Sequence, residues 1–293
     1  MIELLGVDAK GKGTPRPTLV QLSARWERGL HGVVGAPLDG TSLLLSVIAG
    51  RQRIKRGQVA IDGSLADQGR LDVMHVPLDP VLPEALCVGE VLALAAAIRG
   101  EAPATLAPLG LSSLNARRVG SLGPAELRAV AFALAIGSNA ATLLLEEPFA
   151  HLAPSVPSRI AELLAARAKT ATILVTTASV RDAVALGASI SVITRGRLQA
   201  MDEGLAFGGQ LRLRVATAAD SLVRALGADA AIETVDARAY GTHTALTVTG
   251  ADAISVANAV GRAAALERID IEVLESSTLP LDAIRARLGA GTS

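Results

Sequence analysis

The stretch GAPLDGTS, residues 35–42, has the spacing of a phosphate-binding loop but lacks the lysine of such loops. These loops carry two glycines separated by four residues, then a lysine and a serine or threonine that open a helix after a strand. Gly35 and Gly40 occupy the glycine positions and Ser42 the hydroxyl position, but Thr41 stands where the lysine is expected. A tight turn that needs positive φ would explain the two glycines equally well.

A second group of candidate residues follows an apolar stretch. The segment ATLLLEEP, residues 141–148, predicts a strand of the type that is buried on both faces of a parallel sheet, and it ends in Glu146 and Glu147. These carboxylates either retain a function or are two solvated charges at the end of a strand. The spacing does not decide between these alternatives.

The elements that position these residues alternate between strand and helix over the first 200 residues. This order predicts an α/β domain with a mostly parallel sheet over residues 1–207. Helices are predicted over residues 41–50, 88–100, 124–137, 158–168 and 180–187, strands over 57–63 and 171–178, and a hairpin over 189–201. After a boundary near Gly208-Gly209, a β-α-β-β-α-β order predicts a small α+β, ferredoxin-like domain over residues 210–293.

Composition excludes several classes of function. Lys+Arg and Asp+Glu total 28 each, which gives no electrostatic support for a nucleic-acid partner. The single cysteine, Cys87, excludes an internal disulfide and a cysteine-based metal site. The N-terminal residues lack the apolar core of a signal peptide, and we expect a cytoplasmic protein. The four histidines show no ligand spacing, and we expect them to be structural or surface residues: His31, His75, His151 and His243.

Segments in a fixed order resemble the ATP-binding subunit of ABC transporters over essentially the whole chain. Beyond the glycine loop, the similarity lies in five segments and a tail: residues 1–13, 43–63, 73–100, 119–154 and 172–198, and residues 279–288. They resemble the opening strand, the helix and strand after the phosphate-binding loop, the Q-loop with the helical subdomain (about residues 80–137), the signature helix with the Walker B strand and D-loop, and the H-loop strand. The tail resembles the ending of ABC-2-type exporter ATPases with a small C-terminal domain. The resemblance implies a P-loop NTPase-type fold.

The same resemblance implies that most groups used in nucleotide chemistry are replaced. The family's P-loop lysine, Q-loop glutamine, signature serine, D-loop aspartate, switch histidine and adenine-stacking aromatic fall on Thr41, Leu78, Gly123, Ala153, Thr177 and about Gly11. In addition, Pro124 lacks the N–H that the signature segment offers to phosphate, and Asp39 adds a negative charge that opposes an anion.

Three positions remain close to the family's chemistry. Glu147 matches the catalytic base, and Ser42 matches the hydroxyl that meets a magnesium ion. Glu146, one methylene longer than the family's aspartate, is long enough to reach that ion through water. The six replacements nevertheless predict a degenerate, non-hydrolysing homologue, a pseudo-ATPase with weak or absent binding of ATP and magnesium.

The resemblance also implies partners and a location. We expect a homo- or heterodimer with another ABC ATPase-like subunit, and an integral membrane permease-type subunit docked around Leu78 and the helical subdomain. The chain would then lie at the inner face of the cell membrane, in a structural or regulatory role within a transport or motility-type complex. The alternative is an active ABC-type ATPase that couples hydrolysis to export through a permease, with another cation in place of the lysine. A soluble interaction module is a third possibility.

Overall fold

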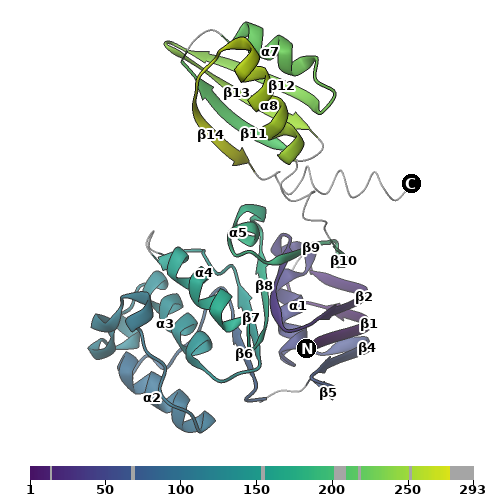
Figure 1. Ribbon diagram of the computed structural model, residues 1–293. Coiled ribbons are helices and arrows are strands. Elements are labelled where there is room, and N and C mark those ends of the chain that lie inside the picture. Colours follow the sequence, from purple (N-terminus) through teal and green to yellow (C-terminus); the bar gives the residue numbers. More distant parts are fainter. Residues whose placement is uncertain are drawn as a thin grey trace. The chain divides into compact units, whose positions relative to one another are not determined.

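The computed structural model divides into two compact units, residues 1–200 and 201–293 (Figure 1). It describes residues 1–13, 15–66, 70–152, 156–200, 209–216, 219–250 and 253–277. Three features of the sequence analysis lie outside these ranges: the D-loop position Ala153, the boundary residue Gly208 and the tail over residues 279–288.

The first unit is built around a six-stranded sheet. Its strands are β3 (Gly29–Val34), β6 (Val73–Val76), β7 (Thr142–Glu146), β8 (Thr172–Thr177), β9 (Ser189–Thr194) and β10 (Arg197–Ala200). The order is β10-β9-β3-β8-β7-β6, and all neighbours are parallel except the β9–β10 hairpin. The carboxyl ends of β3, β8, β7 and β6 therefore meet at one edge. This edge brings together the glycine loop, the Q-loop position and the paired glutamates, and the predicted fold class is confirmed.

A four-stranded antiparallel sheet forms a separate layer of the first unit, and the sequence analysis did not predict it. Its order is β2 (Thr18–Trp26), β1 (Ile2–Lys10), β4 (Ile54–Ile61) and β5 (Ser64–Leu65). Strand β2 was missed because its alternation of buried and exposed residues is interrupted at Gln21, which has a φ of 45°. Such an irregularity shifts the two-residue period by which strands are detected.

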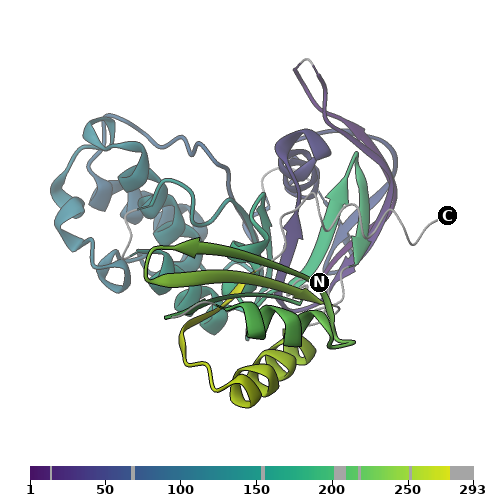
Figure 2. The same cartoon turned by 90° about the horizontal axis from the view of Figure 1, so that it is seen from above.

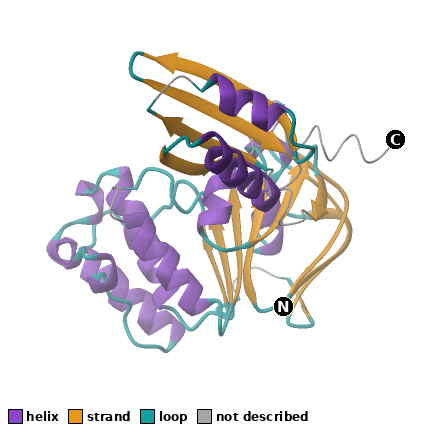
Figure 3. Cartoon of the chain, turned by 45° about the horizontal axis from the view of Figure 1, so that its top comes forward, coloured by secondary structure: helices purple, strands orange, loops and turns teal. Residues whose placement is uncertain are grey.

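The second unit has the predicted β-α-β-β-α-β order. Its elements are β11 (Gln210–Val215), α7 (Asp220–Gly227), β12 (Ile232–Tyr240), β13 (His243–Gly250), α8 (Ala253–Glu267) and β14 (Ile271–Ser277). The sheet order is β12-β13-β11-β14 and every pair is antiparallel. Leu211, Leu213 and Val248 pack with apolar residues of α7 and α8, which lie together on one face of the sheet (Figure 2 and Figure 3). The other face carries polar side chains.

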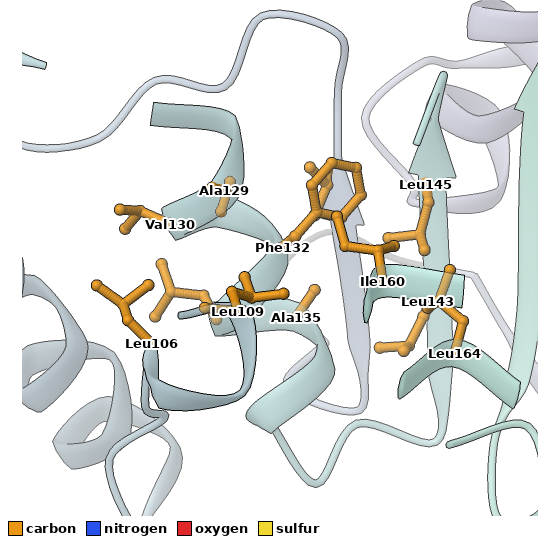
Figure 4. Close-up of a cluster of buried hydrophobic side chains, with 14 of the residues drawn as sticks. Leu106, Leu109, Ala129, Val130, Phe132, Ala135, Leu143, Leu145, Ile160 and Leu164 are labelled. Carbon is orange, nitrogen blue, oxygen red and sulfur yellow. The ribbon is translucent and has the colours of Figure 1, made fainter. Parts of the chain in front are cut away.

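The helices of the first unit cover both faces of the central sheet. They are α1 (Thr41–Ile48), α2 (Val88–Arg99), α3 (Pro124–Gly137), α4 (Val156–Arg167) and α5 (Val180–Ala185). Alternation along β7 sends Leu143 and Leu145 into the cluster formed with α3 and α4, whereas Leu144 joins α1 and the antiparallel sheet. Figure 4 shows Phe132 of α3 beside Ile160 and Leu145 in the first cluster. Among the described residues, no helix combines the length and hydropathy that a membrane span requires.

Truncation of Phe132 tests this packing. Phe132 is fully buried between α3 and the sheet, so Phe132→Ala should lower the free energy of unfolding by about 3–5 kcal/mol. Urea unfolding followed by circular dichroism measures the loss. Leu94→Ala, on the exposed side of α2, is the matched control and should change stability by less than about 0.5 kcal/mol. Equal losses for the two variants would contradict the assigned core.

Candidate functional site

The two glycines of the loop are required for steric reasons. A Cβ atom at Gly35 would lie 2.5 Å from Cγ2 of Ile193. Gly40 has a φ of 105°, and a Cβ atom there would lie 2.9 Å from the carbonyl oxygen of Thr18. Both glycines are therefore explained by backbone geometry, without reference to a phosphate.

The loop uses its own N–H groups internally. Residues 37–39 form a single 3₁₀ turn, in which the N–H groups of Asp39 and Gly40 donate to the carbonyl oxygens of Ala36 (2.9 Å) and Pro37 (3.1 Å). The carboxylate of Asp39 accepts hydrogen bonds from the N–H of Ala36 (2.9 Å) and from the N–H of Arg195 (3.0 Å). The loop thus contains an anion that belongs to the chain itself.

Thr41, at the lysine position, is turned into the loop. Its side chain is buried, and Oγ1 donates to the carbonyl oxygen of Ala36 at 3.4 Å. The methyl group packs against position 35, where its Cγ2 is 3.2 Å from a Cβ atom built on the glycine. Thr41 therefore fills space in the loop and supplies a hydroxyl group without a positive charge.

Glu146 lies beside Ser42, as the parallel strand order predicts. Ser42 Oγ donates to Oε2 of Glu146 at 3.3 Å, and the N–H of Leu78 donates to the same oxygen at 3.2 Å. The carboxylate is buried, and burial is the largest influence, raising its pKa. Hydrogen bonds from His75, Leu78 and Ser42 oppose burial and together hold the pKa of Glu146 below its ordinary value.

His75 is a site residue that the sequence analysis did not single out. Its Nε2 lies 3.3 Å from Oε1 of Glu146, both side chains are nearly buried, and its Nδ1 has no hydrogen-bond partner among the described residues. A usable signal lay in the strand pairing. His75 pairs with Leu144 in the parallel register, and residues 144 and 146 share a face of β7. Within the described ranges, no cluster of three or more His, Cys, Asp or Glu residues could hold a metal ion.

Glu147 faces the switch position and not Ser42. Its Oε2 accepts a hydrogen bond from Thr177 Oγ1 at 2.9 Å, and its Oε1 accepts one from the N–H of Ala178 at 2.7 Å. Burial is the largest influence on its pKa, and with the nearby Asp182 it raises the pKa of Glu147 despite these two hydrogen bonds. The backbone φ of 42° is an uncommon value for a residue other than glycine.

Arg128 of α3 joins the segments that carry these carboxylates. Its fully buried guanidinium donates to the carbonyl oxygens of Glu146 (2.9 Å), Glu147 (2.6 Å) and Ala150 (3.1 Å). It also donates to those of Pro77 and Leu78 in the Q-loop segment. The helical subdomain is therefore hydrogen-bonded to the carboxyl end of β7 and to the segment after β6. A charged residue within an otherwise apolar helix was the signal for this role.

The signature segment, Leu122 to Glu126, forms the start of α3. Pro124 is the first helical residue. The N–H of Gly123 donates to Oε2 of Glu126 at 3.0 Å, and Glu126 also pairs with Arg117. The helix start is thus capped by its own glutamate, in the manner of a capping box.

A glycine loop that joins a parallel strand to a helix, next to paired carboxylates on another strand, defines a P-loop NTPase-type domain. Solved structures with this fold are ATP-binding cassettes. The ATP-binding subunit of an ABC transporter matches with a TM-score of 0.62 and 22% identity, over 69% of this chain and 91% of that one. A cassette solved as a dimer in a post-hydrolysis state with ADP and Pi matches with a TM-score of 0.60 and 18% identity, over 69% and 99% of the two chains.

Sequence relatives establish the family. A thiamine import ATP-binding protein of Rhizobium meliloti is 31% identical over 185 residues, which span 58% of this chain and 77% of that protein. An aliphatic sulfonates import ATP-binding protein of Cupriavidus necator is 33% identical, over 59% of each chain. No protein-family model matches the chain. The chain belongs to the family of ABC transporter ATP-binding proteins.

Removal of the Arg128 guanidinium tests the bridge between α3 and β7. Arg128→Leu leaves several buried carbonyl oxygens without a donor, each of which costs about 1–3 kcal/mol, so we expect a loss of at least about 3 kcal/mol in the free energy of unfolding. Urea unfolding is the measurement, and Arg118→Leu, at an exposed position, is the control. A loss no larger than that of the control would contradict the bridging role.

The opposite pKa shifts of the two glutamates predict opposite pH effects. The lowered pKa of Glu146 stabilises the fold above the ordinary glutamate pKa of about 4.3, and this contribution is lost as the pH falls through the folded pKa. Glu146→Gln should therefore cost about 1.5–3 kcal/mol at pH 7 and less near pH 4. The raised pKa of Glu147 removes stability as the pH rises through its folded value, so Glu147→Gln should gain relative to wild type between pH 4 and 7. Urea unfolding across this range measures both, and parallel pH profiles would contradict the assignment.

Proposed function

We propose that this chain is a degenerate ABC ATP-binding subunit homologue that does not hydrolyse ATP and binds it weakly or not at all. The observation that carries the proposal is the Asp39 carboxylate, which accepts the N–H of Ala36 inside the loop. A phosphate-binding loop works because its N–H groups and its lysine face an anion. Here the chain's own anion takes a donor, and Thr41 provides no charge.

The energetic effect of these replacements is large. A hydrogen bond to a charged group contributes about 1.5–3 kcal/mol, so loss of the lysine alone weakens nucleotide binding by about 10- to 150-fold. The negative charge of Asp39 adds repulsion toward a phosphate. The N–H groups of Asp39 and Gly40, which are bonded within the 3₁₀ turn, would have to exchange partners before they could meet a ligand.

The magnesium position is better preserved, and it favours the alternative of an active ABC-type ATPase. Ser42 and Glu146 lie in contact, and their oxygen atoms suit magnesium. However, the carboxylate of Glu146 also contacts His75 and the N–H of Leu78. A metal ion would have to displace some of these donors. Glu147, the candidate base, is likewise held by Thr177 and Ala178.

The proposed role is structural or regulatory, within a membrane-associated transport or motility-type complex. By their printed names, the relatives serve import of thiamine and of aliphatic sulfonates, and cytochrome c biogenesis export. We infer an integral membrane permease-type partner that docks around Leu78 and the helical subdomain, a second ABC ATPase-like subunit, and a place at the inner face of the membrane. Residues 1–207 would form the ABC-type domain and residues 210–293 the small C-terminal domain.

Restoring the loop chemistry tests the proposal. Wild-type protein titrated with Mg-ATP by calorimetry should give no heat up to millimolar concentration and no phosphate release. The double variant Asp39→Ser/Thr41→Lys should gain at least about 10-fold in ATP affinity, because it removes the internal anion and adds the phosphate-binding cation. Thr41→Lys alone, which keeps Asp39, is the matched comparison and should gain less.

Two results would point to the alternative. Binding of Mg-ATP by the wild type, with phosphate release that Glu147→Gln abolishes, would make the chain a divergent ATPase. A double variant with no gain in affinity would show that Asp39 and Thr41 are not what limits binding.

A further inference from the structure

Strand β12 is a long, unpaired edge of the second unit. It spans nine residues, Ile232 to Tyr240, and seven of them are exposed. It pairs with β13 on one side only, and no other strand of the described chain lies along its outer edge. Proteins usually protect such edges with lysine, proline or very short strands. β12 contains neither residue type and is longer than an average strand.

The charges on β12 lie on the sheet face that the helices leave open. Asp236 pairs across the sheet with Thr247, and Arg238 pairs with Ala245. The intervening residues of β13, Leu246 and Val248, are buried against the helices. Asp236 and Arg238 therefore project from the open face, two residues apart. Neither forms an ion pair within the described part of the chain.

This spacing makes the strand complementary to itself. In an antiparallel pair related by a two-fold axis, residues directly opposite each other must share a face, so the axis passes through one residue. With the axis at Ala237, Asp236 lies opposite Arg238 of the second copy, and the reverse pair forms as well. The neighbouring axes, at Asp236 or at Arg238, would place like charges opposite each other. An axis at Val235 would form no ion pair between these residues.

The same register suits the remaining side chains. Val235 would lie opposite Ala239 on the helix-covered face, and Thr234 opposite Tyr240 on the open face. The two-fold axis runs perpendicular to the sheet, so α7 and α8 of both copies stay on one side. The unpaired backbone groups of both edges would then form hydrogen bonds, and opposite-charge cross-strand pairs add stability.

We propose that two copies of this chain pair through antiparallel β12 strands centred on Ala237, which joins their four-stranded sheets into one. This pairing involves only the second unit, and it does not depend on nucleotide or on the proposed loss of hydrolysis.

Charge reversal in the full-length chain tests the pairing. Sedimentation equilibrium without nucleotide should show a dimer for the wild type. Asp236→Arg or Arg238→Asp alone places like charges opposite each other, and each should raise the dimer dissociation constant by about 10-fold or more. The double variant Asp236→Arg/Arg238→Asp restores both opposite pairs and should dimerise like the wild type. An equimolar mixture of the two single variants should form heterodimers.

Disulfide crosslinking tests the register independently. In a Cys87→Ser background, Ala237→Cys places the two sulfur-bearing side chains directly opposite each other and should crosslink on oxidation. Thr234→Cys is the control, because the two copies of residue 234 would lie about 20 Å apart along the strands, and it should not crosslink. A monomeric wild type, a dimer unaffected by either single reversal, or equal crosslinking at both positions would overturn the proposal.

Discussion

One buried guanidinium ties together the segments on which the first unit's site is built. Arg128 reaches from α3 to the carbonyl oxygens that follow β6 and β7. Burial is the largest influence on its pKa and lowers it, while Asp79, Glu146 and Glu147 act in the opposite direction. A buried cation is tolerated when it is hydrogen-bonded, and here the backbone supplies every bond. The position of the helical subdomain relative to β7 follows from this single residue.

Around this bridge, the polar groups at the sheet edge are satisfied by one another. Asp39 accepts donors from its own loop and from Arg195, and Glu147 accepts donors from Thr177 and Ala178. Glu126 caps its own helix. Each of these contacts lowers the free energy of the arrangement without a ligand, because a buried polar group without a partner is costly. The family fold is retained, and its binding edge is closed by internal hydrogen bonds.

The sequence located the strands and helices of the site well, because the apolar runs of β7 and β8 and the loop glycines are strong local signals. The contact between Ser42 and Glu146 followed from parallel strand order. Local patterns could not indicate that Asp39 would accept the N–H of Ala36, because that bond depends on the 3₁₀ turn. They also did not place His75 beside Glu146, since this proximity arises only when β6 pairs with β7.

The closed loop has a consequence for how such a subunit would respond to its cell. A protein whose loop is ordered by a ligand gains stability from that ligand by mass action. A loop ordered by Asp39 and Thr41 is complete as soon as the chain folds, and it owes nothing to the energy supply. The amount of subunit ready for assembly would then follow its rate of synthesis, in starved and in growing cells alike.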